Sequence, residues 1–138
     1  MKTTMYDILR EISEIESPQD RVTALQQHKY TQAIKQVCLY AYDQNIKWVL
    51  PEGKPPYKPC EFVDVEGRFI SELRKLYLFV EGGNPNLTPF RRETLFIQLI
   101  ESIDPKDASL LCSIKDKKLP FKNLTKKIVH QAFPDINC

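Results

Sequence analysis

Residues 88–112 read TPFRRETLFIQLIESIDPKDASLLC and contain two helix starts in one short stretch. Thr88 and Asp104 are each followed by proline, which is the order of an N-cap residue and a first helical position. Apolar residues follow each start at helical spacing: Leu95, Phe96, Leu99, Ile100 and Ile103, then Ala108, Leu111 and Cys112. The stretch therefore predicts two consecutive helices, each with one buried face.

The same spacing extends to both sides of this stretch. It predicts helices near residues 5–15, after the Ser17-Pro18 start, over 33–41, over 69–80 and over about 124–133. Four prolines and Gly53 interrupt the pattern between residues 48 and 66, so we expect a surface loop there. The predicted fold is all-α: a single compact domain over residues 1–138, with about six to seven helices and a Pro-rich loop near 48–66.

Composition limits the classes of protein that this chain can represent. It is 42% hydrophobic, too apolar for a disordered protein, and it has no apolar run long enough to cross a membrane. The start of the chain lacks the apolar stretch of a signal peptide. The four cysteines are widely spaced, at positions 38, 60, 112 and 138. We therefore expect a cytoplasmic protein with free thiols, no metal site and no cofactor.

No group of residues resembles a catalytic site. His28 and His130 lack the spaced partners of a metal site or a catalytic triad. Gly82-Gly83 precedes Asn-Pro-Asn, which suits a turn and not a phosphate-binding loop. We expect a protein that is not an enzyme and has no catalytic residues.

The positive charge of the chain is concentrated in residues 113–127. This segment holds six lysines and one acid, Asp116, for a net charge of +5, whereas the rest of the chain has 14 basic and 17 acidic side chains. Clustered positive charge on a nearly neutral protein favours an anion-binding surface, most often for nucleic-acid phosphate.

Two expected helix starts carry basic residues where acids are the stabilising choice. Arg91 and Arg92 follow Thr88, and Lys126 and Lys127 follow Asn123. A bound anion would make these positions favourable, because helix amides, helix dipole and basic side chains would all face it. The alternative is that these side chains are only solvated surface.

The sequence thus gives a candidate set of DNA phosphate-binding residues. It consists of Lys115, Lys117, Lys118, Lys122, Asn123, Thr125, Lys126, Lys127, Arg91 and Arg92. The expected partner is double-stranded DNA, bound through the sugar-phosphate backbone. An alternative is a protein-interaction module that binds another protein. Its candidate contact residues are Trp48, Tyr57 and Phe62 in the Pro-rich loop.

The order of several segments resembles a known family. These segments are Tyr6–Ile12, the Ser17-Pro18 start, residues 33–42, residues 96–100, residues 108–115, and residues 119–134. They resemble the amino-terminal DNA-binding domain of ATP-dependent DNA ligases, closest to the compact bacteriophage type, and are similar to short uncharacterised bacteriophage proteins. The turn at 119–122 lacks the glycine that is usual in that domain, and residues 48–67 have no counterpart in it.

The resemblance implies an all-α domain that grips duplex DNA around a nick. It implies that Asn123, Thr125 and Lys126 approach phosphate. Ligases attach AMP to the lysine of a Lys-x-Asp-Gly motif in a separate domain, and Lys115-Asp116-Lys117-Lys118 does not match that motif. The resemblance therefore implies a stand-alone accessory protein for DNA replication, repair or genome handling, which binds double-stranded or nicked DNA and is located in the host cytoplasm if phage-encoded. For the alternative interaction module, a phage origin implies a phage or host protein as partner, bound for host takeover, inhibition or an adaptor role in replication or transcription.

Overall fold

The computed structural model describes residues 4–51, 53–61 and 68–138. These residues form seven α-helices and one 3₁₀-helix, η1. The elements are α1 (Met5–Ser13), α2 (Pro18–Gln27), α3 (Thr31–Tyr42), α4 (Arg68–Glu72), η1 (Leu73–Phe79), α5 (Pro89–Ile100), α6 (Pro105–Lys115) and α7 (Lys126–Ala132). The predicted all-α fold is confirmed.

Side-chain caps fix where the helices begin. The Thr88 hydroxyl accepts a hydrogen bond from the Arg91 amide at 3.2 Å, and the Asp104 carboxylate accepts one from the Lys106 amide at 2.9 Å. Ser17 caps α2 in the same way. First-turn amides have no acceptor within their own helix, so these side chains supply one. The helix starts predicted at Ser17, Thr88 and Asp104 are confirmed.

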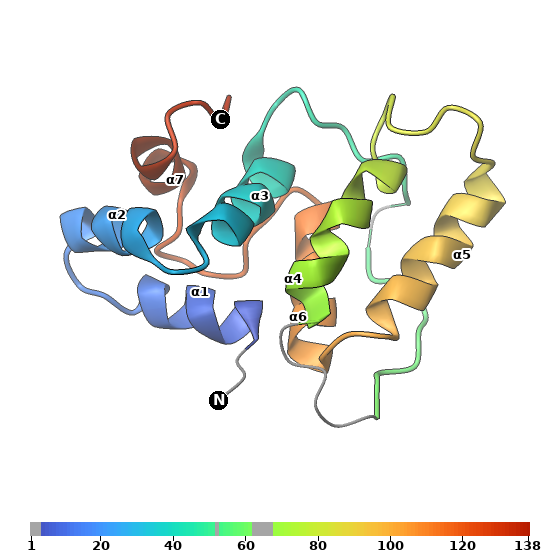
Figure 1. Cartoon of the computed structure of the whole chain (residues 1–138), viewed down its shortest axis with the longest axis horizontal. Helices are drawn as coiled ribbons and strands as arrows, with labels where there is room; N and C mark the ends of the chain where they lie inside the picture. The colour runs from blue at the N-terminus through green and yellow to red at the C-terminus, as the bar shows by residue number, and fades with distance from the viewer. Residues whose placement is uncertain (1–3, 52, 62–67) are drawn as a thin grey trace.

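Helix α6 provides the centre of the packing. Its Leu110, Leu111 and Ile114 are fully buried, and α1, α3 and α5 all pack against it. In Figure 1, α1, α2 and α7 gather at one end of the molecule and α5 lies at the other, with α3 and α6 between them. Helix α7 packs on α2, so the carboxy-terminal helix returns to the amino-terminal end of the fold.

The helix predicted over 69–80 has two parts with different winding. After α4 the chain tightens into η1, in which Leu73, Leu76 and Phe79 are 2%, 0% and 1% exposed. A spacing of three places these residues on one face of a 3₁₀-helix, which has three residues per turn. Tyr77, which α-helical spacing from Leu73 would place on the same face, is 49% exposed.

Trp48 anchors the beginning of the loop predicted over 48–66. Its indole packs against Tyr40, Phe79 and Phe96, and its Nε1 donates to the Tyr40 carbonyl at 3.0 Å. An antiparallel bridge pairs Trp48 with Val80. Further along, the Lys58 amide donates to the Glu101 carboxylate at 2.8 Å. The described part of this loop is therefore bonded to the helices that it crosses.

All four cysteines are free thiols. Cys38 and Cys112 are buried, as their positions on helical apolar faces predicted, whereas Cys60 and Cys138 are partly exposed. Burial raises the pKa of Cys38 to about 12, so its thiol stays protonated near neutral pH.

The turn between η1 and α5 gives a test of this packing. A Cβ at Gly83 would lie 1.7 Å from the Tyr77 carbonyl oxygen, while a Cβ at Gly82 would meet nothing within 4 Å. We expect Gly83→Ala to lower the free energy of unfolding by about 2–3 kcal/mol, because backbone must move. Gly82→Ala, at φ +82°, should cost only about 1 kcal/mol. Urea unfolding of both variants measures this, and an equal or larger cost at Gly82 would contradict the packing.

Candidate nucleic-acid interface

The lysine-rich segment begins with a tight turn at the end of α6. The Lys117 amide donates to the Ile114 carbonyl and the Lys118 amide to the Ser113 carbonyl, both at 2.9 Å. This pair of bonds forms a Schellman motif, and Lys117 takes the left-handed position in it with φ 62°. Glycine is the usual residue there, because a Cβ makes the conformation less favourable.

The Lys117 side chain explains why lysine occupies this position. Its Nζ donates to the carbonyl oxygens of Asp43 at 2.7 Å and Ile46 at 3.0 Å, just beyond the carboxyl end of α3. The Tyr40 carbonyl lies 3.4 Å from the same atom. Burial lowers the pKa of Lys117, against the opposing effect of Asp43. The ammonium is therefore used within the fold, and the predicted phosphate contact for Lys117 is corrected.

Lys115 is also withdrawn from solvent. It is 4% exposed, and its Nζ donates to the Pro51 carbonyl at 2.7 Å and to the Asp116 carboxylate at 2.6 Å. The Asp116 carboxylate also accepts hydrogen bonds from the Gly53 amide. A buried, paired ammonium cannot reach a DNA phosphate without breaking these contacts, so Lys115 leaves the predicted set.

Asn123 is used to join the turn to α1. Its Nδ2 donates to the Ser13 carbonyl at 2.9 Å, and its own carbonyl accepts from the Arg21 guanidinium at 3.2 Å. Thr125, and not Asn123, caps α7, accepting from the Ile128 amide at 3.3 Å. Helix α7 consequently begins at Lys126, two residues later than predicted. One Nδ2 hydrogen of Asn123 is used in the bond to Ser13, but the residue is exposed, so its phosphate contact stays a prediction.

Four lysines of the segment remain available to solvent. We call Lys118, Lys122, Lys126 and Lys127 the lysine turn; each is exposed, and none forms an ion pair with a described residue. The sequence has no Asp or Glu between positions 117 and 134. Thr125 is exposed as well, although its hydroxyl oxygen caps α7. Together with the exposed Asn123, these five residues are the part of the predicted set whose exposure permits binding at this turn.

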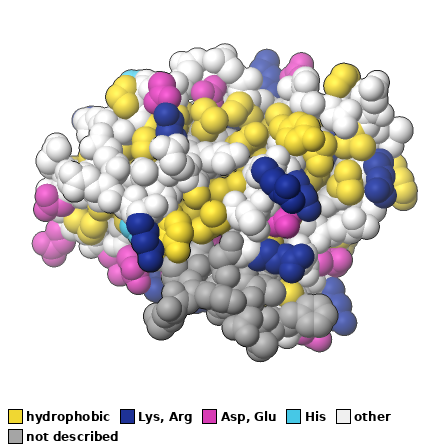
Figure 2. Space-filling model, in the orientation of Figure 1, with side chains coloured by type: hydrophobic (Ala, Val, Ile, Leu, Met, Phe, Trp, Pro, Cys, Tyr) yellow, Lys and Arg dark blue, Asp and Glu magenta, His cyan; other side chains and the backbone are white. Residues whose placement is uncertain are grey.

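The two basic helix starts do not form one surface. Arg92 donates to the carbonyl oxygens of Leu78 at 3.3 Å and Leu87 at 3.0 Å, so it holds the turn before α5. Arg91 is exposed, but α5 and α7 lie at opposite ends of the molecule (Figure 1). On the face drawn in Figure 2, lysine and arginine side chains are scattered among apolar and acidic ones. Arg92 therefore leaves the candidate set, and Arg91 stands apart from the lysine turn.

The predicted protein-binding residues are mostly parts of the fold. The Trp48 ring packs among other aromatic rings, and Tyr57 is partly buried against the core. Phe62 lies outside the described residues. The sequence analysis missed Phe90, which is 80% exposed in the first turn of α5. This exposure could be predicted from the sequence. At about 100° per residue, Phe90 points roughly opposite to Leu99, which lies on the buried face.

Neither histidine forms part of a larger polar cluster. His28 Nδ1 accepts from the Tyr30 amide at 3.0 Å, and His130 Nδ1 lies 3.1 Å from the Ile136 carbonyl oxygen. Among the described residues, no group of three His, Cys, Asp or Glu side chains could hold a metal ion. No helix within those ranges has the length and apolar character needed to span a membrane.

The assignment of Lys117 to the fold can be tested by unfolding. We expect Lys117→Met to lower the free energy of unfolding by about 2–3 kcal/mol, because it removes charge-assisted hydrogen bonds and leaves carbonyl groups without a donor. Lys118→Met, one residue further on and exposed, should change it by less than about 0.5 kcal/mol. Urea denaturation followed by circular dichroism compares the two, and similar losses would refute the distinction.

Comparison with known proteins gives one family. Residues 8–120 match a family of unknown function (DUF6433). This range runs from α1 into the turn after α6, so it includes Lys118 and ends before Lys122. No curated protein and no solved structure shows a significant match to the chain. Because the matched range covers most of the sequence, the chain belongs to this family of unknown function, DUF6433.

Proposed function

We propose that this protein is a non-enzymatic accessory protein that binds the backbone of duplex DNA through the lysine turn. The observation that supports it is the group of four exposed lysines in a stretch of chain without acids. Lysine ammonium groups bind phosphate as point charges and contribute little to base recognition. We therefore propose binding without strong sequence preference, in DNA replication, repair or genome handling.

The fold lowers the expected strength of this binding relative to the sequence alone. Six lysines carry the charge of residues 113–127, but Lys115 and Lys117 are bonded within the protein. If each lysine of the turn neutralises one phosphate, the logarithm of the association constant falls with the logarithm of salt concentration with a slope of about −3.6. The rest of the chain has more acidic than basic side chains, which favours binding only at low to moderate salt.

Charge reversal with a matched control tests the proposal. The variant Lys122→Glu/Lys126→Glu/Lys127→Glu should bind a fluorescent duplex at least about tenfold more weakly than wild type, with a salt slope shallower by about 3. The control is Lys29→Glu/Lys47→Glu/Lys58→Glu, which makes the same change in net charge at exposed lysines outside the turn. Fluorescence anisotropy over a series of salt concentrations measures both quantities for intact and nicked duplexes.

Three results would count against the proposal. These are no binding at micromolar protein in low salt, equal losses in the two triple variants, and a salt slope that the lysine-turn variant does not alter. Tighter binding to nicked than to intact duplex would support the resemblance to ligase DNA-binding domains. Equal binding to the two would limit the proposal to general duplex binding.

A second candidate function is a protein-interaction module, and the exposed aromatic residues favour it. Phe90 is 80% exposed and Tyr77 is 49% exposed, an unusual exposure for large rings. Aromatic side chains are enriched at protein interfaces, where burying them gives much of the binding energy. Helix α5, which carries Phe90 in its first turn, lies at the opposite end of the molecule from α7 (Figure 1), so variants at Phe90 and in the lysine turn can separate the two candidates.

Phe90→Ser provides the discriminating variant. Because Phe90 is so exposed, we expect this change to alter the free energy of unfolding by less than about 0.5 kcal/mol. A phage or host protein captured from lysate by wild type and by the lysine-turn variant, but not by Phe90→Ser, would favour the interaction module. Capture that depends on the lysine turn and on added DNA, but not on Phe90, would count against it.

A further inference from the structure

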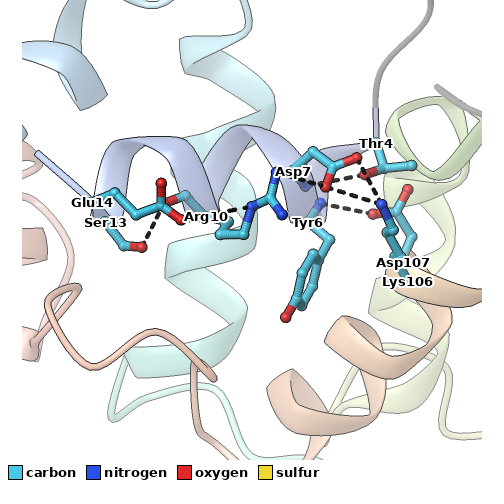
Figure 3. Close-up of polar contacts among 8 residues, drawn as sticks. All are labelled: Thr4, Tyr6, Asp7, Arg10, Ser13, Glu14, Lys106 and Asp107. Atoms are coloured by element: carbon cyan, nitrogen blue, oxygen red, sulfur yellow. Dashed lines mark hydrogen bonds and ion pairs between the residues drawn. The ribbon is translucent and has the colours of Figure 1, made fainter.

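The amino-terminal ends of α1 and α6 meet at a buried carboxylate. Asp107, in the first turn of α6, is fully buried, and its Oδ1 accepts a hydrogen bond from the Tyr6 amide of α1 at 2.9 Å (Figure 3). An amide in the first turn has no acceptor in its own helix. Asp107 therefore supplies from α6 an acceptor that α1 needs, and it ties residues 101 positions apart in the sequence.

The second oxygen of this carboxylate has no such partner. Asp107 Oδ2 is buried and makes no hydrogen bond to any described residue. A buried oxygen that carries charge without a hydrogen bond is costly, because water no longer solvates it. Proton uptake removes that charge while Oδ1 can still accept the bond from Tyr6. The site is thus built so that the neutral carboxyl fits it better than the carboxylate.

The charged groups nearest to this junction strengthen the preference. Asp7 of α1 and Asp104, the cap of α6, both act on Asp107 as like charges. Lys106, the neighbouring cation, donates to Asp7 at 3.2 Å, and Arg10 also pairs with Asp7 (Figure 3). Helices α3 and α5 also pack on α6, and no described residue of theirs forms a hydrogen bond or ion pair with Asp107.

Burial and the neighbouring carboxylates together raise the pKa of Asp107 towards neutral pH. Burial raises the pKa of Asp107 most, the amides of Tyr6 and Met5 lower it, and Asp104 and Asp7 raise it further, to about 6. We propose that Asp107 is a proton-operated latch: its neutral carboxyl holds α1 on α6, and its ionisation loosens that contact. Loosening would be local to this junction, because α1 also packs on α2.

The direction of the pH effect follows from the two titration points. Burial raises the pKa of the Asp107 carboxyl from its ordinary value of 3.8 to about 6 in the fold. An acid whose pKa is raised by folding stabilises the closed contact at low pH, and this contribution is lost as pH rises from about 4 to about 6. Above pH 7 the contribution is constant at its lowest value.

Hydrogen exchange of one amide reports on the latch directly. The Tyr6 amide is bonded to Asp107, so its protection measures this contact. After correction for intrinsic exchange, we expect the protection factor of the Tyr6 amide to fall between pH 4 and pH 7 by on the order of tens of fold. A pKa difference of about two units between the closed and open states limits this fall to roughly a hundredfold. The Val129 amide of α7, bonded to the Thr125 carbonyl, is the reference and should not follow this change.

Carbon NMR of the Asp107 carboxyl supplies the independent measurement in the unaltered protein. We expect a midpoint near pH 6, shared by the Tyr6 amide resonance. A midpoint below about 4.5 would overturn the proposal. So would Tyr6 protection that stays constant while the carboxyl titrates, because ionisation would then occur without loosening.

Two variants complete the test. Asp107→Asn keeps an oxygen acceptor for Tyr6 and cannot ionise, so it should abolish the fall in Tyr6 protection. Asp104→Asn is the control: asparagine also caps helices, and the response should remain with a slightly lower midpoint. A full pH response in Asp107→Asn would exclude Asp107 as its origin. If that variant does not fold, the carboxyl titration of wild type still decides.

Discussion

The contact between Lys117 and the carboxyl end of α3 is the constraint on which the rest of the candidate interface depends. The ammonium is shared by the carbonyl oxygens of Asp43 and Ile46, which follow a helix end with partial negative charge. To make this contact, Lys117 adopts a left-handed conformation that lysine rarely takes. The strained turn then sets the direction in which the chain leaves α6, and with it the position of Lys118, Lys122 and α7.

Sequence predicted the helices whose determinants are local. Ser17, Thr88 and Asp104 each cap a helix by bonding an amide two or three residues further along, so the signal lies within one short stretch. The winding of residues 73–79 could not be predicted in this way. Over seven residues, apolar spacings of three and of 3.6 look alike, and only packing against α3 and α5 shows which residues are buried.

The candidate site was only partly predictable, because burial of a lysine leaves no local mark. Lys115 and Lys117 lie within three residues of Lys118 in the sequence, yet their partners, Pro51 and Asp43, lie more than sixty residues earlier. The number of charges in the segment therefore does not distinguish lysines that are bonded within the fold from lysines that are exposed. The exposure of Phe90, in contrast, could be predicted from the sequence. Helical geometry places Phe90 on the side of α5 away from the buried face, in the same turn as Arg91 and Arg92.

Some lysines of the segment are bonded within the fold and others are exposed, and this difference affects how the turn could bind an anion. Lys117, Asn123 and Thr125 fix its backbone through bonds to α3, α1 and α7. Lys118, Lys122 and Lys126 have exposed side chains on that fixed backbone. A phosphate contact would then order side chains alone, because no loop has to fold, and this reduces the entropy lost on binding. Lys115 and Lys117 each remove one charge from the surface, but their bonds hold the turn in place, and this would favour the proposed binding indirectly.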